Sequence, residues 1–216
     1  LKLEGDVCAV TGALGGMGVE ICREFARNGA NVVLLDLDEE KVKAAAANLA
    51  AEFGIHAEGY KMNATDEAEV QAAVDATIAE FGRVDVLVNT AGILRFAAME
   101  DLPLSDWNEV LNVNLTGYFI TSQRFGREMI KAGKGRLVHI STVASHSPET
   151  FSGVYSSTKA GVNMMSKMLA AEWGPYGVRS NCVEPCFVKT PMSASFYADP
   201  EVEKSRSRLI ATRRIG

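Results

Sequence analysis

The chain has 216 residues, of which 47% are hydrophobic and 23% are charged, and both fractions are average for a globular protein. A chain this apolar can bury enough surface to offset its ordering entropy, which excludes a disordered protein. The mean hydropathy is only +0.03 and no run of eighteen apolar residues occurs, which argues against a membrane span. The net charge is −5 and no basic run occurs, so we expect no nucleic-acid binding.

The four cysteines, Cys8, Cys22, Cys182 and Cys186, do not make a disulfide framework for a chain of this length. Cys182 and Cys186 could form half of a metal site, but no His or Cys partner lies at ligand spacing. We therefore expect free thiols and no metal. The first residues show no charged-then-apolar signal pattern, so the expected location is the cytoplasm.

Short β-branched runs alternate along the chain with segments of helical periodicity. The strand-like runs are residues 7–10, 31–35, 56–62, 84–88, 136–140 and 178–183. Apolar residues recur at helical spacing over residues 42–53 and 70–81. Two of the strands are almost wholly apolar, which is typical of parallel strands covered on both faces. The pattern predicts a single doubly wound Rossmann-type α/β domain over residues 1–216, with helices on both faces of a parallel sheet.

A glycine-rich turn directly follows the first predicted strand and opens a helix. Residues 11–18 read Thr-Gly-Ala-Leu-Gly-Gly-Met-Gly. Such a turn lets backbone N–H groups approach a pyrophosphate at the start of a helix. Alone it could be only a strand-to-helix connection, but its place in a βαβ unit indicates a nucleotide site. The cofactor contacts expected from this turn are Gly12, Leu14, Gly16, Met17 and Gly18.

Asp36 ends the second predicted strand, where a carboxylate can accept hydrogen bonds from both hydroxyls of a ribose. The same charge repels a 2′-phosphate. No Arg or Lys occupies the glycine turn, and Leu37 follows Asp36. The sequence therefore predicts NAD(H) as the cofactor and not NADP(H).

Tyr155 and Lys159 stand at positions i and i+4 of a predicted helix and so share a face. A lysine ammonium beside a phenol favours the ionised phenol and lowers its pKa from the usual value of about 10. Tyr155 could then accept a proton near neutral pH. Taken alone, however, an incidental pair on an amphipathic helix is the commoner explanation.

Asn114 interrupts an apolar stripe on a predicted helix over residues 107–119. A buried amide must find hydrogen-bond partners or it destabilises the fold. The local sequence leaves two interpretations open, a structural bond to the backbone and a working polar group.

Together these residues resemble the short-chain dehydrogenase/reductase family over effectively the whole chain. Residues 11–18 look like the family's TGxxxGxG turn, and Tyr155 with Lys159 looks like its YxxxK motif. Residues 89–92, Asn-Thr-Ala-Gly, look like its NNAG motif, and Asn114 matches its catalytic asparagine. Val188 and Thr190, after Pro185, look like the segment that holds the nicotinamide carboxamide, and five motifs in the right order make an accidental likeness very improbable.

The resemblance implies a role for each matching residue. Tyr155 would be the base in alcohol oxidation and the acid in ketone reduction. Lys159 would hold the nicotinamide ribose and lower the tyrosine pKa, and Asn114 would anchor a water in the proton relay. The further cofactor contacts that it implies are Asn63 and Ala64 near the adenine, Asn89, Ala91 and Gly92 in the NNAG-like segment, and Pro185, Val188 and Thr190 at the nicotinamide carboxamide.

The chain departs from the family at several positions. Thr142 stands where the family has its catalytic serine, and Ser141 precedes it; the spacing to Tyr155 selects Thr142. Asn63 replaces an aspartate near the adenine, and Cys186 replaces the glycine after the proline. Residue 216 comes before the family's last helix and strand, which commonly form a subunit interface, so we expect those elements to be absent here.

We therefore expect an NAD(H)-dependent oxidoreductase that moves a hydride between nicotinamide and a secondary alcohol or ketone, such as a polyol, a sugar-like or a cyclic alcohol. Thr142, His146 and Phe187 are the expected substrate contacts. One alternative is a 3-oxoacyl-thioester reductase acting on acyl-carrier protein, against which Asp36 argues because that activity usually draws on NADPH. Another is a non-catalytic NAD-binding regulatory protein. We also expect a homo-oligomer, either a tetramer or a dimer.

Overall fold

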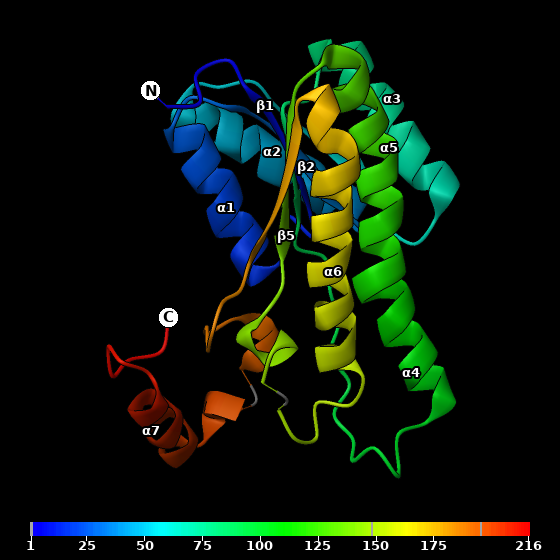
Figure 1. Ribbon diagram of the computed structural model, residues 1–216. Helices are drawn as coiled ribbons and strands as arrows, with labels where there is room; N and C mark the ends of the chain where they lie inside the picture. Colours follow the sequence, from blue (N-terminus) through cyan, green and yellow to red (C-terminus); the bar gives the residue numbers. More distant parts are fainter. Residues whose placement is uncertain (1, 148, 195) are drawn as a thin grey trace.

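A computed structural model describes residues 2–147, 149–194 and 196–216 of the chain (Figure 1). Within those residues, six strands form one sheet in the order β3-β2-β1-β4-β5-β6, and every neighbouring pair is parallel. The strands are β1 Val7–Thr11, β2 Asn31–Asp36, β3 Ala57–Lys61, β4 Val86–Asn89, β5 Gly135–Ile140 and β6 Val178–Val183. This confirms the predicted parallel α/β sheet.

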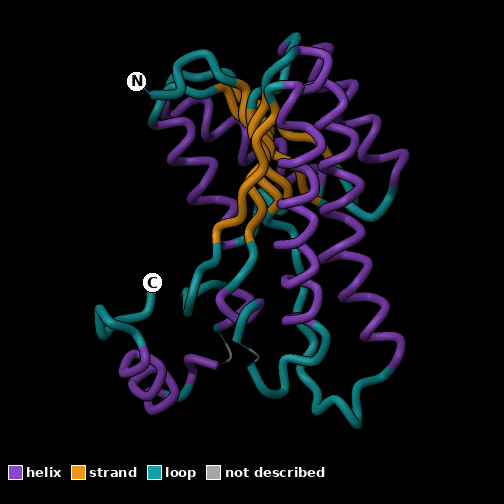
Figure 2. Tube along the Cα trace, viewed as in Figure 1, coloured by secondary structure: helices purple, strands orange, loops and turns teal. Residues whose placement is uncertain are grey.

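Helices cover both faces of the sheet, with α1 and α2 on one side and α3, α5 and α6 on the other, as Figures 1 and 2 show. The α-helices of the described part are α1 Gly16–Arg27, α2 Glu39–Phe53, α3 Glu67–Phe81, α4 Leu104–Leu111, α5 Gly117–Ala132, α6 Tyr155–Trp173 and α7 Pro200–Leu209. The two helical layers explain why β1, β2 and β4 are apolar along nearly their whole length: both faces of each strand are buried.

Alternate residues of each strand supply the two cores. Cys8 and Val10 of β1 face the α1–α2 layer, whereas Val7 and Ala9 belong to the core beneath α3, α5 and α6. Phe125 of α5 is fully buried in that second core. Both faces of β1 are therefore fixed, so the register of the central strand cannot slip by one residue without inverting the core.

The two helices predicted from apolar spacing, α2 and α3, begin and end on recognisable caps. Asp38 and Asp66 accept hydrogen bonds from backbone N–H groups in the first turns of α2 and α3. Gly54 and Gly82 end these helices in the left-handed conformation that suits glycine. Both helices start a few residues before the predicted segments, because charged first-turn residues carry no apolar period.

The large apolar side chains of α5 and α6 divide into two groups. Phe125 is fully buried, whereas Phe119, Met164 and Met168 are exposed on α5 and α6.

In the part of the chain that the structure describes, every helix is too short or too polar to cross a membrane.

Gly59 in β3 sets how closely α2 packs on the sheet. A Cβ atom at this position would overlap the backbone carbonyl of Val42 in α2. The glycine therefore lets the helix backbone rest on the strand beside the carboxyl end of β2.

We expect Gly59→Ala to lower the free energy of unfolding by about 1–3 kcal/mol, the usual cost of overpacking, because α2 must move away from β3. Urea denaturation measures this change. Gly117→Ala is the matched control, since a Cβ there makes only an ordinary contact of 3.4 Å with Ala64 and the backbone is helical. Its stability should be unchanged or slightly higher. Equal stability of the two variants would contradict this packing.

Candidate active site

Two cavities lie at the carboxyl ends of the strands, around the point where the strand order reverses between β1 and β4. Open α/β sheets bind ligands at this switch point. The first cavity has a volume of about 530 Å³ and is lined by the turn after β1 and by the ends of β2, β3 and β4. The second has about 140 Å³ and is lined by segments after β5 and β6 and by α7. Met17 and Thr190 line both, so the cavities adjoin.

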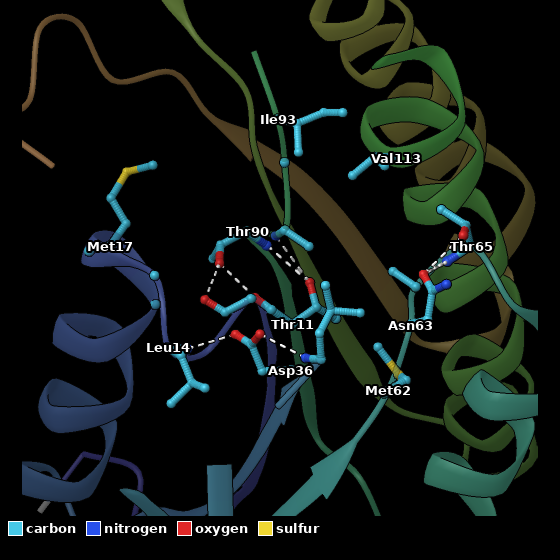
Figure 3. A pocket seen from close by; sticks show the side chains of 18 of the residues that line it. Thr11, Leu14, Met17, Asp36, Met62, Asn63, Thr65, Thr90, Ile93 and Val113 are labelled. Carbon is cyan, nitrogen blue, oxygen red and sulfur yellow. Dashed lines mark hydrogen bonds between the residues drawn. The ribbon is translucent and has the colours of Figure 1, made fainter. Parts of the chain in front are cut away.

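The ends of β1 and β4 are tied together by threonine side chains (Figure 3). The Thr90 hydroxyl donates to the carbonyl of Thr11 at 2.6 Å, and the Thr90 backbone N–H donates to the Thr11 hydroxyl at 3.2 Å. Thr90 therefore keeps a polar link at the position where the family motif has its second asparagine.

Asn89 supports the first cavity from behind and does not line it. Its side chain is fully buried; its Oδ1 accepts from the Thr121 hydroxyl at 2.9 Å and its Nδ2 donates to Ser122 Oγ at 3.1 Å. β4 turns this side chain toward α5, and the cofactor contact expected of Asn89 stays a prediction.

The glycine turn allows the backbone to close tightly at the start of α1. Gly12 has φ +63°, and a Cβ there would lie 2.8 Å from Ala91 Cα. A Cβ on Gly18 would overlap the carbonyl of Gly12. No side chain caps α1 and no acidic residue stands in its first turn, so its N-terminal N–H groups open on the cavity and suit an anion.

Asp36 lies at the end of β2, as expected, and its carboxylate stands beside the glycine turn. Its Oδ2 accepts from the Leu14 N–H at 2.8 Å and its Oδ1 from the Leu37 N–H at 2.7 Å. Asp36 and Glu109 are the charged residues of the first cavity, and the lining residues that the structure describes include no Lys, Arg or His. The cavity wall is therefore acidic.

Asn63 and Ala64 line the far end of the same cavity. The Asn63 Oδ1 accepts from the N–H and the hydroxyl of Thr65 at 3.1 and 2.9 Å (Figure 3). These bonds fix the amide plane, so the Asn63 Nδ2 group is the donor that a base in this cavity would meet.

The hydroxyls of Ser141 and Thr142, at the end of β5, make different hydrogen bonds. The Ser141 hydroxyl is buried and donates to the Lys159 carbonyl at 3.2 Å. The half-buried Thr142 hydroxyl accepts from the Ala144 N–H at 3.2 Å. Both residues line the second cavity together with Tyr155, so the structure brings the predicted hydroxyl and phenol to one site.

Lys159 does not point at the Tyr155 hydroxyl as the spacing suggested. Its Nζ donates to the Ile140 carbonyl at 2.7 Å and to Tyr118 Oη at 3.0 Å, and it lies 5.8 Å from the centre of the Tyr155 ring. Burial, together with the charge of Glu149, raises the pKa of Tyr155. The predicted lowering of the phenol pKa is therefore wrong for this structure, because the ammonium is held by α5 and β5.

Asn114 lies in a π-helical turn, Asn112–Thr116, that interrupts the predicted helix between α4 and α5. Its Oδ1 accepts from the Ile93 N–H and its Nδ2 donates to the Ile93 carbonyl, both at 2.8 Å. The side chain thus clamps the loop after β4, and these two bonds satisfy its buried amide. Such π-turns are frequent at functional sites.

The remaining predicted residues divide between the two cavities. Pro185, Phe187, Val188 and Thr190 line the second cavity, as expected for a segment at the nicotinamide end. His146 does not line it: the ring is exposed and its Nε2 lies 3.0 Å from the Glu184 carboxylate. The substrate contact expected of His146 stays a prediction; in this structure the ring pairs with Glu184, and His146 is not among the described lining residues of the cavity.

The sequence motifs missed a charged pair at the second cavity. Arg206 of α7 pairs with Glu149 at 3.1 Å, and its guanidinium lies 4.7 Å from the centre of the Phe187 ring. Glu149 was recognisable as a loop residue near the site, but Arg206 lies outside every motif. The pair joins α7 to the loop before α6 over the cavity.

The family model described as short chain dehydrogenase matches residues 6–201. The chain belongs to the short-chain dehydrogenase family. A relative from Mycolicibacterium smegmatis named D-threitol dehydrogenase is 40% identical over 214 residues, which cover 99% of this chain and 82% of the relative.

Two solved structures share the fold over the whole chain. The structure of an NAD⁺-bound xylitol dehydrogenase has a TM-score of 0.94 at 29% identity and covers 100% of this chain and 88% of that chain. A gluconate 5-dehydrogenase from Burkholderia cenocepacia J2315, in complex with NADP and tartrate, has a TM-score of 0.96 at 31% identity and covers 100% and 84%. The protein is thus an oxidoreductase of a family that acts on alcohols and ketones with a nicotinamide nucleotide.

Proposed function

We propose that this protein is an NAD(H)-dependent dehydrogenase of small secondary alcohols, preferably polyols or sugar-like alcohols, and that residues 1–216 act as one catalytic domain. The choice of NAD(H) over NADP(H) rests on the acidic wall of the first cavity. Asp36 offers a carboxylate to the two ribose hydroxyls, whereas a 2′-phosphate would meet Asp36 without a compensating cation among the described lining residues.

The residues of the first cavity fit a dinucleotide. The space above Gly12 and Gly18 is closed to any Cβ, so backbone and not side chains would face a pyrophosphate. Asn63 and Ala64 would border the adenine, and Ala91 and Gly92 would border the nicotinamide ribose. Pro185, Val188 and Thr190 would hold the carboxamide.

The bound nicotinamide would accept the hydride in alcohol oxidation and supply it in ketone reduction. Tyr155 would take the hydroxyl proton as the alcohol is oxidised and return it in the reverse direction. Thr142 would donate a hydrogen bond to the substrate oxygen as charge develops there. Lys159 would supply the positive charge behind Tyr155 and hold the ribose, and the turn at Asn114 would anchor a water of the proton relay.

The second cavity supports a small polar substrate. Its volume is about 140 Å³ and the carboxamide would border the same space, which leaves little room for a large substrate. The Glu149–Arg206 pair offers acceptors and donors to hydroxyl groups, and Phe187 offers an apolar wall. A four- or five-carbon polyol fits this combination better than an acyl thioester. Turnover of a panel of alcohols with NAD⁺ would separate these substrates, and turnover of none would favour the non-catalytic alternative.

We further propose a homo-oligomer, a dimer or tetramer, in the cytoplasm. Phe119, Met164 and Met168 are exposed apolar side chains on α5 and α6, which supports a covered face. The cysteines are free thiols, which suits a reducing compartment.

NAD⁺ should be used with a catalytic efficiency about 100-fold or more above that of NADP⁺, because like-charge contact with Asp36 costs several kcal/mol. Asp36→Ala should narrow this ratio by at least tenfold. Steady-state kcat/KM with both nucleotides measures it. Glu40→Ala removes an exposed nearby carboxylate outside the cavity and should leave the ratio unchanged. Equal efficiency with both nucleotides in the unmutated protein would refute the assignment.

Tyr155→Phe keeps the ring and removes the proton acceptor, so kcat should fall about 10²–10⁴-fold, the usual contribution of acid–base catalysis. NAD⁺ binding, followed by tryptophan fluorescence, should persist. Tyr176→Phe, at an exposed tyrosine, is the matched control and should keep full activity. A Tyr155→Phe variant with most of its activity would require another proton acceptor.

Removal of the Thr142 hydroxyl in Thr142→Val should lower kcat about 10²–10³-fold, the cost of one donor to a developing oxyanion. Thr142→Ser retains the hydroxyl and should stay active. Ser141→Ala should have a mild effect, because its hydroxyl is already bonded to the Lys159 carbonyl. An inactive Ser141→Ala beside an active Thr142→Val would transfer the role to Ser141.

A further inference from the structure

Tyr118 is a fully buried residue of α5 that the family motifs do not include. Its Oη lies 3.0 Å from the Lys159 Nζ and donates to the Ile140 carbonyl at 3.2 Å. The same ammonium donates to the Ile140 carbonyl at 2.7 Å. The phenol, the ammonium and the carbonyl therefore form a closed triangle behind the second cavity.

This triangle uses two of the three protons of the Lys159 ammonium, which leaves one for a further acceptor. The Tyr118 ring adds a second contact, since Nζ lies 4.5 Å from its centre, within the range of a cation–π interaction. Tyr118 thus contacts the ammonium through its oxygen, and its ring lies close to the same charge.

No carboxylate forms an ion pair with Lys159 within the described ranges, although the side chain is almost completely buried. The titratable groups around it are Tyr118 on α5, Tyr155 on α6, His139 on β5 and Cys182 on β6. Burial lowers the pKa of His139 to about 4, so this ring is neutral at pH 7. Neutral oxygens therefore stabilise the ammonium, and Tyr118 is the one on a side chain.

We propose that Tyr118 is a positioning residue for Lys159, whose hydroxyl keeps the ammonium charged and fixed between α5 and β5. The importance of this position for turnover rests on the role that the proposed function gives Lys159. The evidence for the contact itself is the arrangement of three atoms: Lys159 Nζ, Tyr118 Oη and the Ile140 carbonyl oxygen.

The contact between Tyr118 and Lys159 predicts a change in the pH dependence of activity. Burial lowers the pKa of Lys159 to about 7, so this amine titrates near neutral pH. Loss of an acceptor destabilises the charged form and lowers the pKa further. Because the protonated amine is the active form, activity is lost as pH rises through this pKa. In Tyr118→Phe the alkaline limb of the kcat/KM profile should therefore move to lower pH.

The experiment compares Tyr118→Phe with Tyr176→Phe, which removes the hydroxyl of an exposed tyrosine. Nuclear magnetic resonance of lysine-labelled protein without nucleotide follows the Lys159 side chain, assigned by its absence in Lys159→Arg. We expect its titration midpoint to fall by about one pH unit or more in Tyr118→Phe, as the loss of a hydrogen bond to a charged group implies. The midpoint should stay unchanged in Tyr176→Phe. A thermal unfolding curve checks that each variant is folded.

An unchanged Lys159 midpoint in folded Tyr118→Phe would overturn the proposal. A lower midpoint together with an unchanged kcat/KM profile would overturn the importance for turnover. A failure of the proposed function is distinguishable, because the unmutated protein would then oxidise no alcohol with NAD⁺ while the resonance titration still tests the contact.

Discussion

The chain leaves β1 and β4 toward opposite sides of the sheet, because β1 continues to β2 and β4 continues to β5. Hydrogen bonds nevertheless hold the carboxyl ends of β1 and β4 together, and both cavities depend on this junction. Thr90 bonds to the Thr11 carbonyl, and Asn89 joins the same strands to α5 from within the core. The junction places Gly12 against Ala91, where only a glycine fits. The helix start, the acidic ribose position and the loop clamped by Asn114 are all arranged around it. A chain that lost this link would keep its sheet and lose the shape of its site.

Burial decides the electrostatics of the site. Parallel strands between two helical layers leave little water, so each polar group there needs a protein partner. Asn89 and His139 satisfy each other and their neighbours, with Asn89 Nδ2 3.2 Å from His139 Nδ1. The same dry surroundings raise the pKa of Tyr155 and lower that of Lys159. Burial therefore disfavours the charged form of both groups, and the contacts that hold the ammonium matter more than they would near solvent.

The sequence predicted what depends on local pattern. Apolar runs located the strands, and the glycine turn with Asp36 located the acidic end of the first cavity. The tertiary directions of side chains were not predictable in this way: Asn89 faces α5, His146 lies against Glu184, and Lys159 bonds to Tyr118. A spacing of four residues places two side chains on one helix face, but it does not say what the neighbouring helix offers them. Arg206 was out of reach for the same reason, because α7 meets the cavity only in the folded chain.

The proposed function requires that this site move a hydride directly between an alcohol carbon and a nicotinamide. It is tested most directly with a secondary polyol that carries deuterium on the reacting carbinol carbon, incubated with NAD⁺ and the unmutated protein. Mass spectrometry of the nucleotide follows the label. We expect one deuterium in each reduced nucleotide and one molecule of ketone for each reduced nucleotide formed. Reduced nucleotide without the label, or no reduction across the panel of secondary alcohols, would contradict it.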